Sequence, residues 1–466
     1  MQANRRDFLK GCCAAAIAAG SGNATAFFDP LALSGAKSAA TGDVLVYVFL
    51  RGAIDGLHLV VPYSGSDRVA YESKRGSLAI PANRLRQIGS SPWAWHPRAG
   101  GGVADAISST PKWLQRLYNA NRLGIVHATG MPTPNRSHFE AQAMMELGTP
   151  GVTGGSNGWL ARYLAAISGT PGLPAPVIAP AFGFGGNLQT SLIGLDEAVG
   201  FNTAEQFRVD GFHWNWNNSN AGNGENGAPT QLLPLWSGNS SLERAGRDAA
   251  DALSFMRNYD FSANGYTPDG GAVYPSGTFG TQLRNLAQML KSPIKTGLIA
   301  AAIDHGFWDT HDGQGMPQPG NANQWDWFGN LAEELGRGLD AFYTDLNAYV
   351  IPNSGGQNLM HKVTVIVQSE FGRRFLPNGS SGTDHGYGNI MLALGNRVNG
   401  GMMHGTFPGL DDNSLYESQD VAVTTDFRQI LSEALVDRMG FPTNQLPQVF
   451  PGFSYNNGLR NVFQTG

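Results

Sequence analysis

The stretch from Val363 to Tyr387 constrains the fold most strongly. It begins with the apolar, β-branched run Val363–Val367, becomes polar at Glu370, and continues through a glycine-rich loop to Asp384 and His385. A short apolar run rich in β-branched residues predicts a buried strand. In an open α/β sheet, ligands bind beyond the carboxyl ends of the strands. The acids and the histidine that follow this strand are therefore candidate site residues.

Similar apolar runs alternate with amphipathic stretches along most of the chain. Strands that alternate with helices favour an α/β fold in which helices cover both faces of a mostly parallel central sheet, with loop insertions. Residues 63–110 read as a mixture of short strands and loops. The predicted strands are 43–50, 123–128, 174–184, 296–304, 363–367 and 389–394, and the predicted helices are 111–121, 138–147, 157–166, 242–257, 278–291, 325–349 and 426–439.

The N-terminus predicts a targeting segment. Arg5 and Arg6 are followed, after one residue, by Phe-Leu-Lys, then by the apolar stretch Cys12–Ala19 and by an Ala-x-Ala sequence ending at Ala26. This order is typical of a twin-arginine signal peptide, here residues 1–26. The alternative interpretation is a short basic tail with a small helix. With the signal, we expect the twin-arginine translocase as a partner and a periplasmic or secreted bacterial protein.

Composition narrows the partners and the metal chemistry. The formal net charge is −5 and no dense block of Lys or Arg occurs, which argues against nucleic acid as a partner. Cys12 and Cys13 are the two cysteines of the chain, and both lie in the predicted signal. A metal in the remaining chain must therefore use His and oxygen ligands. Beyond the signal, no apolar run reaches the roughly 18 residues of a membrane span, so we expect no stable membrane anchor.

Residues 27–466 are long enough to bury a large core, and we predict one domain with insertions. One insertion is expected near residues 205–240, which are rich in Trp, Asn and Gly and lack periodicity.

Polar residues of a restricted kind follow four of the predicted strands. Parallel strands place their carboxyl ends at one edge of the sheet, so we expect these residues to converge. A group of carboxylates and imidazoles repels itself unless a cation lies among them. Carboxylate with His favours Zn²⁺ or Mn²⁺, carboxylate alone favours Ca²⁺ or Mg²⁺, and two ions could clamp an in-line displacement. The residues are Asp55, Arg136, Ser137, His138, Asp309, His311, Glu370, Asp384 and His385, and all but His138 are assigned a role in the site.

Each candidate also has a purely structural interpretation. Asp55 precedes a glycine and can be a turn residue. Ser137 and Glu140 form a Ser-x-x-Glu capping box, although the same helix start would also hold an anion beside Arg136. Glu370 can pair with an arginine of the following loop. His127, inside a predicted strand, fits a hydrogen-bonded core histidine.

Several motifs occur together in one order, at residues 49–52, 55–57, 127–128, 136–142, 158–160, 308–311, 369–373 and 383–386. Together they resemble a family of twin-arginine-exported bacterial proteins of unassigned function, often labelled sulfatase-like. That family resembles the alkaline phosphatase and sulfatase superfamily in fold. The resemblance implies an alkaline-phosphatase-like domain with a metal site along one sheet edge.

The resemblance also implies roles for single residues. Asp55 would be the metal ligand after the first strand, and Ser137 would occupy the nucleophile position. Asp309 and His311 would bind one metal, with Glu370 at the other metal and His385 as the late histidine ligand. The chain departs from the superfamily at Glu370-Phe371, where phosphatases commonly have Asp-His, and in the short spacing of Asp309 and His311. The sulfatase Cys/Ser-x-Pro-x-Arg motif does not occur.

These features lead to two functional hypotheses. The first is an exported metal-dependent hydrolase of phosphate or sulfate esters, in which Ser137 attacks while Arg136 or Arg373 holds the non-reacting oxygens. Its substrate would be a small anionic ester or a glycan. The alternative is a non-catalytic exported binding or scaffold protein on the same fold.

Overall fold

The computed structural model divides the chain into two compact units. The larger unit contains Asp43–Gly155, Pro268–Ala287 and Ile303–Gly466. The predicted signal, the predicted helix 242–257 and most of the predicted insertion at 205–240 lie outside the described residues, and the prediction of one domain over 27–466 stays a prediction. The structure describes residues 43–101, 110–155, 157–168, 181–184, 188–195, 198–201, 233–238, 265–291, 298–315, 326–459 and 461–465.

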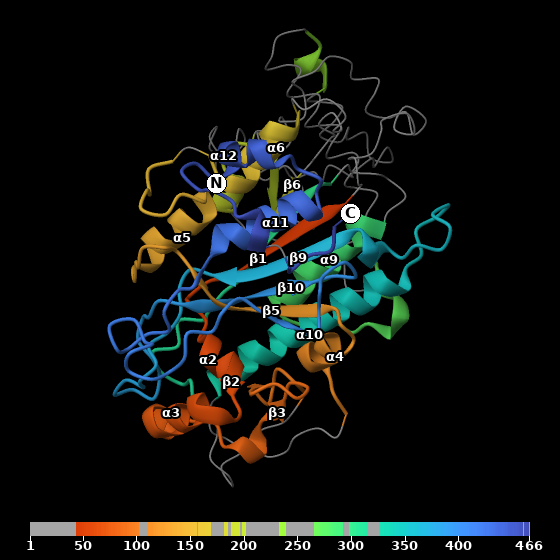
Figure 1. Cartoon of the computed structure of the whole chain (residues 1–466). Helices are drawn as coiled ribbons and strands as arrows, with labels where there is room; N and C mark the ends of the chain where they lie inside the picture. Colours follow the sequence, from red (N-terminus) through yellow and green to blue (C-terminus); the bar gives the residue numbers. More distant parts are fainter. Residues whose placement is uncertain are drawn as a thin grey trace, which may run out of the picture. The chain divides into compact units, whose positions relative to one another are not determined.

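The larger unit is built on a mixed sheet with strand order β11-β5-β10-β9-β1-β8 (Figure 1). β1 runs parallel to β9, whereas β10 is antiparallel to both β9 and β5. β11 and β12 pair with β5 in parallel. The strands are β1 (Val44–Leu50), β5 (Leu123–Gly130), β8 (Ala300–His305), β9 (Val363–Ser369), β10 (Asn389–Leu394), β11 (Met403–His404) and β12 (Thr425–Asp426).

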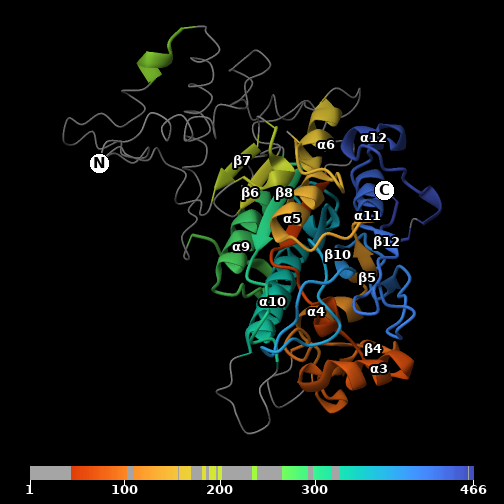
Figure 2. The same ribbon diagram turned by 90° about the vertical axis from the view of Figure 1, so that its left-hand side faces the viewer.

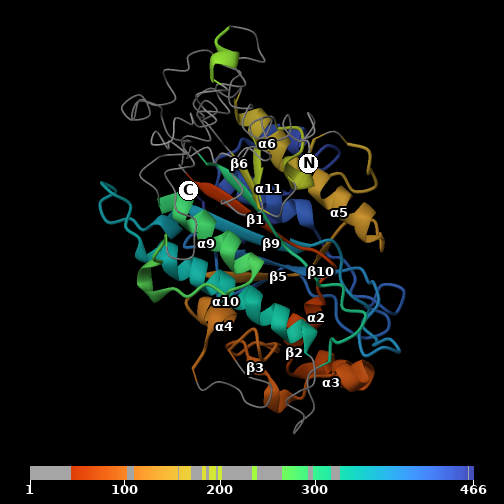
Figure 3. The same cartoon turned by 180° about the vertical axis from the view of Figure 1, so that it is seen from behind.

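Helices of this unit cover both faces of the sheet. α11 (Phe427–Asp437) lies in front of the strands in Figure 1, whereas α9 (Thr278–Lys291) and α10 (Trp327–Ala348) lie in front of them when the unit is viewed from behind in Figure 3. Figure 2 shows α10 and α11 on opposite sides of β5 and β10. All seven residues of β1 and of β9 are buried, as expected for strands covered on both faces. The predicted α/β fold with a mostly parallel, mixed sheet is confirmed.

The long helix α10 shows why such segments are helical. The side chain of Asp326 caps its start by accepting from the backbone N–H of Gly329 at 2.8 Å. Its buried residues recur every three or four positions, which places them on the face that packs against the core. They include Phe328, Leu331, Leu335, Leu339, Phe342 and Leu346.

Residues 63–110 form more structure than the sequence predicts. A small antiparallel sheet has the order β2-β4-β3, with β2 (Val60–Pro62), β3 (Arg86–Gln87) and β4 (Trp93–Trp95). The helix α3 (Gly65–Arg75) was not predicted, because its sequence is mostly polar. The other helices of the unit, where η marks short 3₁₀ helices, are α2 (Gly56–Leu59), η3 (Gly76–Leu78), η4 (Ala82–Arg84), α4 (Trp113–Asn119), α5 (His138–Leu147), η8 (Asp269–Gly271), η9 (Leu359–His361), η10 (Thr443–Gln445), α12 (Leu446–Val449) and η11 (Asn457–Leu459).

The described part of the smaller unit contains a parallel strand pair, in which Ala181 of β6 lies opposite Ala198 of β7. Its elements are α6 (Trp159–Ser168), β6 (Ala181–Phe184), η5 (Thr190–Leu192), β7 (Ala198–Phe201) and η7 (Leu233–Trp236). In neither unit does a described helix combine the length and the apolarity required to cross a membrane.

Candidate metal site

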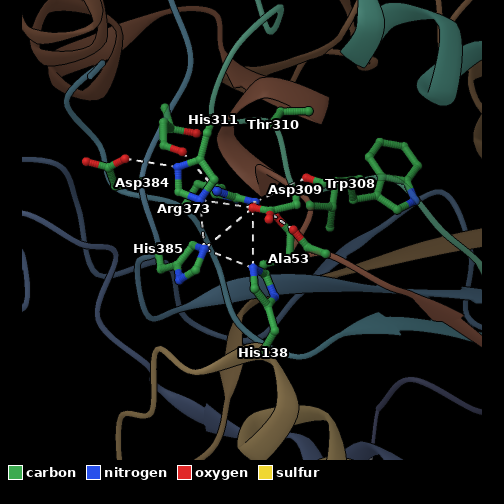
Figure 4. Close-up of polar contacts among 12 residues, drawn as sticks. Ala53, His138, Trp308, Asp309, Thr310, His311, Arg373, Asp384 and His385 are labelled. Carbon is green, nitrogen blue, oxygen red and sulfur yellow. Dashed lines mark hydrogen bonds and ion pairs between the residues drawn. The ribbon is translucent and has the colours of Figure 1, made fainter. Parts of the chain in front are cut away.

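Three histidines converge on Asp309 in the larger unit (Figure 4). The Nε2 atoms of His311, His138 and His385 lie 3.1, 3.3 and 3.5 Å from Oδ1 of Asp309. Nε2 of His385 lies 2.9 Å from Nε2 of His138 and 2.9 Å from Nε2 of His311. The corners of a tetrahedron around an ion with bonds of roughly 2.0–2.1 Å are about 3.3 Å apart. The distances among His138, Asp309 and His385, 2.9 to 3.5 Å, are close to this spacing, and these three residues form the candidate ligand set. His311 contacts Asp309 and His385 but lies outside this set.

The other nitrogen of each ring also has a polar partner. Each Nδ1 lies within hydrogen-bond distance of a carboxylate or carbonyl oxygen, and with the hydrogen on Nδ1 each Nε2 would present a lone pair. A metal-ligating histidine typically makes this second hydrogen bond, which orients the ring. The acceptors are Glu370 Oε1 for His138 at 2.8 Å, Asp384 Oδ1 for His311 at 3.0 Å, and the backbone carbonyl of Arg136 for His385 at 2.8 Å.

Protonation of a ring is an alternative way to remove the repulsion between nitrogen lone pairs that face each other. Burial opposes protonation of His138, but the hydrogen bond and charge of Glu370, with the charge of Asp309, outweigh it and raise the pKa of His138. Burial lowers the pKa of His385. A proton on Nε2 of His138 would satisfy its contact with His385 and leave the contact between His311 and His385. A divalent ion held by His138, His385 and Asp309 would satisfy the facing nitrogens of both histidines.

The charges around the group also favour a cation. Asp309, Glu370 and Asp384 contribute three negative charges, and the guanidinium of Arg373 contributes one positive charge. With neutral imidazoles, two negative charges are uncompensated within this set, and a divalent ion balances them. His138, Asp309 and His385 each offer a ligand atom within 4.8 Å of the others.

The fold brings these residues to one edge of the sheet. His138 is the first residue of α5, which follows β5, and Asp309 and His311 lie in the loop after β8. His385 returns from the loop after β9 and forms an isolated β-bridge with Arg373. The loop after β1 approaches so closely that a Cβ on Gly52 would lie 2.5 Å from the backbone nitrogen of Asp309, and Gly52 has a φ of +111°. Only glycine fits at this approach.

Two further residues near the group have a left-handed backbone. Ala53 has a φ of 61° and Phe307 has a φ of 72°. A bulky residue in this region is an outlier, and such conformations are commonly found at functional sites. Phe307 is also 74% exposed, and its carbonyl accepts from Trp327 Nε1 at 2.8 Å. Both residues are in loops that lead to site residues, Ala53 beside Gly52 and Phe307 before Asp309.

Glu370 lies behind His138 and outside the set of His138, Asp309 and His385, and its role as a ligand stays a prediction. Its Oε1 accepts from His138 Nδ1, from Gln142 Nε2 at 2.8 Å and from the backbone N–H of Gly52 at 2.8 Å. Its Oε2 accepts from Ser369 Oγ at 2.9 Å. Burial alone would raise the pKa of Glu370, but the hydrogen bonds from His138 and Gln142 outweigh it and lower the pKa. Its charge therefore stays on the side of His138 away from the group.

Asp384 has a similar place beside His311, and its role as a ligand also stays a prediction. Its Oδ1 contacts His311 Nδ1 at 3.0 Å and accepts from Asn378 Nδ2 at 3.1 Å. These hydrogen bonds, first that of Asn378 and then that of His311, lower the pKa of Asp384. The carboxylate orients the ring and leaves Nε2 for the group.

Asp55 does not join the group. Its carboxylate accepts from Arg75 at 2.5 and 3.0 Å, from Gln314 Nε2 at 2.5 Å and from the backbone N–H of His58 at 3.1 Å. Arg75 and Asp55 are both buried. Because these donors occupy both carboxylate oxygens, Asp55 forms a structural ion pair, and its predicted role as a metal ligand is not supported.

Arg373 has its guanidinium buried against backbone carbonyls, which corrects its predicted role of holding substrate oxygens. It donates to the carbonyls of Gly52 at 2.7 Å, Ala53 at 2.8 Å and Thr383 at 2.9 Å, and it also binds Oδ1 of Asp309. Burial would raise the pKa of Asp309, but Arg373 outweighs it and lowers the pKa.

Arg136 and Ser137 lie at the start of α5. The guanidinium of Arg136 binds Asp420 and, at 2.8 Å, Glu417, so it is occupied by acids, contrary to its predicted catalytic role. Ser137 is exposed, and its side chain makes no capping hydrogen bond to α5. It lies between Arg136, whose carbonyl orients His385, and His138. Its role as a nucleophile stays a prediction.

The main residue that sequence reasoning missed is His138. The segment Arg136–Glu140 was interpreted through Ser137, as a nucleophile or as an N-cap. The available signal was a histidine beside Ser137 in a motif that follows a buried strand. His127, by contrast, is buried in β5, and its ring lies 4.5 Å from that of Trp93, which confirms it as a core residue.

Part of the chain matches a known family model. Residues 279–449 match the family model described as "Protein of unknown function (DUF1501)". The match includes Asp309, His311, Arg373 and His385, whereas His138 lies before it. No curated protein matches the chain. Among solved structures, the lipoteichoic acid synthase LtaP from Listeria monocytogenes matches with 9% identity and a TM-score of 0.31, over 94% of this chain and 80% of that chain. We transfer no residue role from that structure.

Proposed function

We propose that the protein is an exported, metal-dependent hydrolase of small anionic esters, with one divalent transition-metal ion held by His138, His385 and Asp309. The observation that carries the metal centre is the set of two histidine nitrogens and one carboxylate oxygen that lie within 4.8 Å of one another. Two nitrogen ligands and one oxygen ligand favour Zn²⁺ or Mn²⁺ over Ca²⁺ or Mg²⁺, which take oxygen ligands. Because Asp55 and Glu370 lie outside the group, the geometry favours one ion over two.

A bound divalent ion would supply a Lewis acid and a water molecule of lowered pKa. The residues of the chain support this chemistry in distinct ways. Glu370 and Asp384 keep the rings of His138 and His311 in place. Asp309 and His311 have side chains that are 45% and 43% exposed, so the ligand set is accessible from solvent on this side. Ser137 is adjacent to His138 in the sequence, and its hydroxyl remains the candidate nucleophile.

Arg374 supports an anionic substrate. The neighbouring Arg373 is bound to carbonyls and Arg136 is bound to two acids, so neither guanidinium is free for a substrate. Arg374 is half-buried, and within the described residues no acid or carbonyl binds its side chain. Its charge contributes to the lowered pKa of Asp384, after the hydrogen bonds of Asn378 and His311. We propose that Arg374 contacts the phosphate or sulfate group.

The N-terminal segment supports export. Arg5 and Arg6, the apolar stretch and the Ala-x-Ala sequence are the parts of a twin-arginine signal. In this proposal the chain folds and acquires its metal before translocation, and then acts in the periplasm or outside the cell.

Two measurements on the full chain test the proposal together. Elemental analysis after purification is expected to find about one transition-metal ion per chain. Turnover is then measured with a panel of aryl phosphate and sulfate esters, before and after removal of the metal by a chelator. We expect turnover that is lost with the metal and restored by Zn²⁺ or Mn²⁺. Metal-free protein that hydrolyses esters at the native rate would contradict the metal-dependent mechanism, and full activity of Ser137→Ala would exclude the serine nucleophile.

A further inference from the structure

We propose that Gln142 and Arg51 are positioning residues of the metal centre. Gln142 holds the carboxylate of Glu370 behind His138, and Arg51 holds the amide of Gln142. This inference rests on the proposed function, because His138 is one ligand of the proposed metal ion. It extends the support of that ligand beyond Glu370, to side chains on α5 and on the loop after β1.

One face of α5 carries a row of polar side chains. His138, Gln142 and Glu146 are spaced by four residues, and residues at this spacing lie on the same side of a helix. Gln142 is half-buried and Glu146 is buried, so the row runs from the start of α5 into the protein interior. Polar side chains in such places require partners, because a buried polar group without one is costly.

Gln142 connects two groups of opposite hydrogen-bonding character. Its Nε2 donates to Oε1 of Glu370 at 2.8 Å, and the same oxygen lies 2.8 Å from Nδ1 of His138. Its Oε1 accepts from Nη1 of Arg51 at 3.3 Å. A guanidinium only donates and an ionised carboxylate only accepts, so one orientation of the amide satisfies both neighbours. Gln142 therefore fixes the carboxylate oxygen that faces His138.

Arg51 is anchored by both its side chain and its backbone. Its guanidinium binds Oε2 of Glu146 at 2.8 Å and Oδ1 of Asp304 at 2.9 Å. Its backbone N–H donates to the carbonyl of His305 at 2.9 Å, and its carbonyl accepts from the N–H of Trp308 at 3.1 Å. Arg51 therefore joins α5 to the end of β8 and to the following loop, which carries a second ligand of the proposed ion.

The charges along this row suit an amide between Arg51 and Glu370. The positive charge of Arg51 is shared by two carboxylates, those of Glu146 and Asp304. A guanidinium bound directly to Glu370 would compete with His138 for the same oxygen. The neutral amide donates a hydrogen bond without adding charge, so the negative charge of Glu370 remains on the side of His138. An outer carboxylate of this kind orients a metal-ligating ring and raises its basicity.

The test measures the Zn²⁺ affinity of the full chain by competition with a chromophoric chelator. Gln142→Leu removes both hydrogen bonds at similar size, and we expect the affinity to fall by about 10-fold, the lower end of the effect of outer partners of a ligand. In the Glu370→Gln background the same substitution should cost less than about 2-fold, because Gln142 acts through Glu370. Gln115→Leu removes a glutamine that bonds Asn119 within α4, and this control should bind Zn²⁺ as the native chain does.

Two further variants carry the test where Gln142→Leu does not fold. Gln142→Asn keeps an amide but shortens the side chain, so it cannot reach both neighbours. Arg51→Lys keeps a positive charge beside Glu146 but lacks the planar fork that also reaches Gln142. Each should lower the affinity of the folded chain, and in the Glu370→Gln background this loss should again disappear.

Two results would overturn the inference while leaving the metal centre intact. The first is native affinity in folded Gln142→Leu or Gln142→Asn. The second is an equal loss in the native and Glu370→Gln backgrounds, which is expected of a residue that supports only the fold. Failure of the native chain to bind Zn²⁺ would instead overturn the metal centre, and with it the proposed function.

Discussion

Asp55 and Asp309 are two acids that follow strands of the same sheet, and each contacts an arginine. Around Asp55, the hydrogen-bond partners of the carboxylate are all donors: Arg75, the amide of Gln314 and a backbone N–H. Around Asp309, one donor, Arg373, is joined by three imidazole nitrogens. The first carboxylate is satisfied by the protein alone, whereas the second belongs to a group that a cation completes. The neighbours of an acid, and not its place after a strand, therefore separate a structural ion pair from a metal ligand.

The largest expected effect is on the structural side of this comparison. Asp55→Asn leaves Arg75 buried without its counter-charge, which typically costs about 3–5 kcal/mol. We expect the free energy of unfolding, measured by denaturant titration, to fall by this amount. Metal bound per folded chain should stay at the native level. Loss of metal from folded Asp55→Asn would show that Asp55 belongs to the metal site after all.

The ion pair of Asp55 and Arg75 should make the free energy of unfolding depend on pH in a predictable direction. Burial would raise the pKa of Asp55, but Arg75 outweighs it, so the folded-state pKa lies below the ordinary value. A depressed pKa stabilises the fold above the unfolded-state pKa of about 3.9, and this stabilisation is lost as the pH falls. The difference in unfolding free energy between the native chain and Asp55→Asn should therefore be constant above about pH 5 and shrink below about pH 4. A difference that grew on acidification would contradict the ion pair.

On the metal side, loss of one ligand should have the next largest effect. His385→Ala removes the nitrogen that contacts both other histidines, and we expect metal affinity to fall by more than about 100-fold. Competition with a chromophoric chelator measures this loss. His361→Ala, which changes a histidine outside the group, is the matched control and should bind metal as the native chain does.

A positioning residue should matter less than a ligand. Glu370→Gln removes the charge that orients His138 but keeps an acceptor of similar shape, so we expect metal affinity to fall by about 10- to 100-fold. The same chelator competition applies. An affinity equal to that of the native chain would mean that Glu370 acts only in packing, as Asp55 does.

The smallest effect is expected at Arg374. A charge-assisted hydrogen bond contributes about 1.5–3 kcal/mol, so Arg374→Ala should raise KM for the best anionic ester of the panel by about 10-fold or more. Metal content and kcat should be unchanged. Arg337→Ala on α10, which pairs with Glu333 within the same helix, is the control. A fall in kcat with unchanged KM would place Arg374 in a different role.

The parts of this comparison differ in how far the sequence reveals them. Strands buried on both faces appear in the sequence as apolar runs, and helices buried on one face, such as α5, α9 and α10, appear as a repeat of apolar residues. The partner of Asp55 has no such pattern, because Arg75 lies on α3, a mostly polar helix.

Two other features depend on the folded loops. Arg373 and Arg374 are neighbours of the same type, yet one is buried against carbonyls and the other has no such partner. His138 joined the group because the start of α5 faces the loops after β8 and β9. A pattern along one chain does not record such approaches between distant segments.

The most direct test of the central claim is anomalous diffraction at the zinc absorption edge from crystals of the Zn²⁺-loaded protein. The account predicts one strong peak in the larger unit, about 2.0–2.1 Å from Nε2 of His138 and of His385. A peak between Asp55 and Glu370, or no peak beside these two histidines, would contradict it.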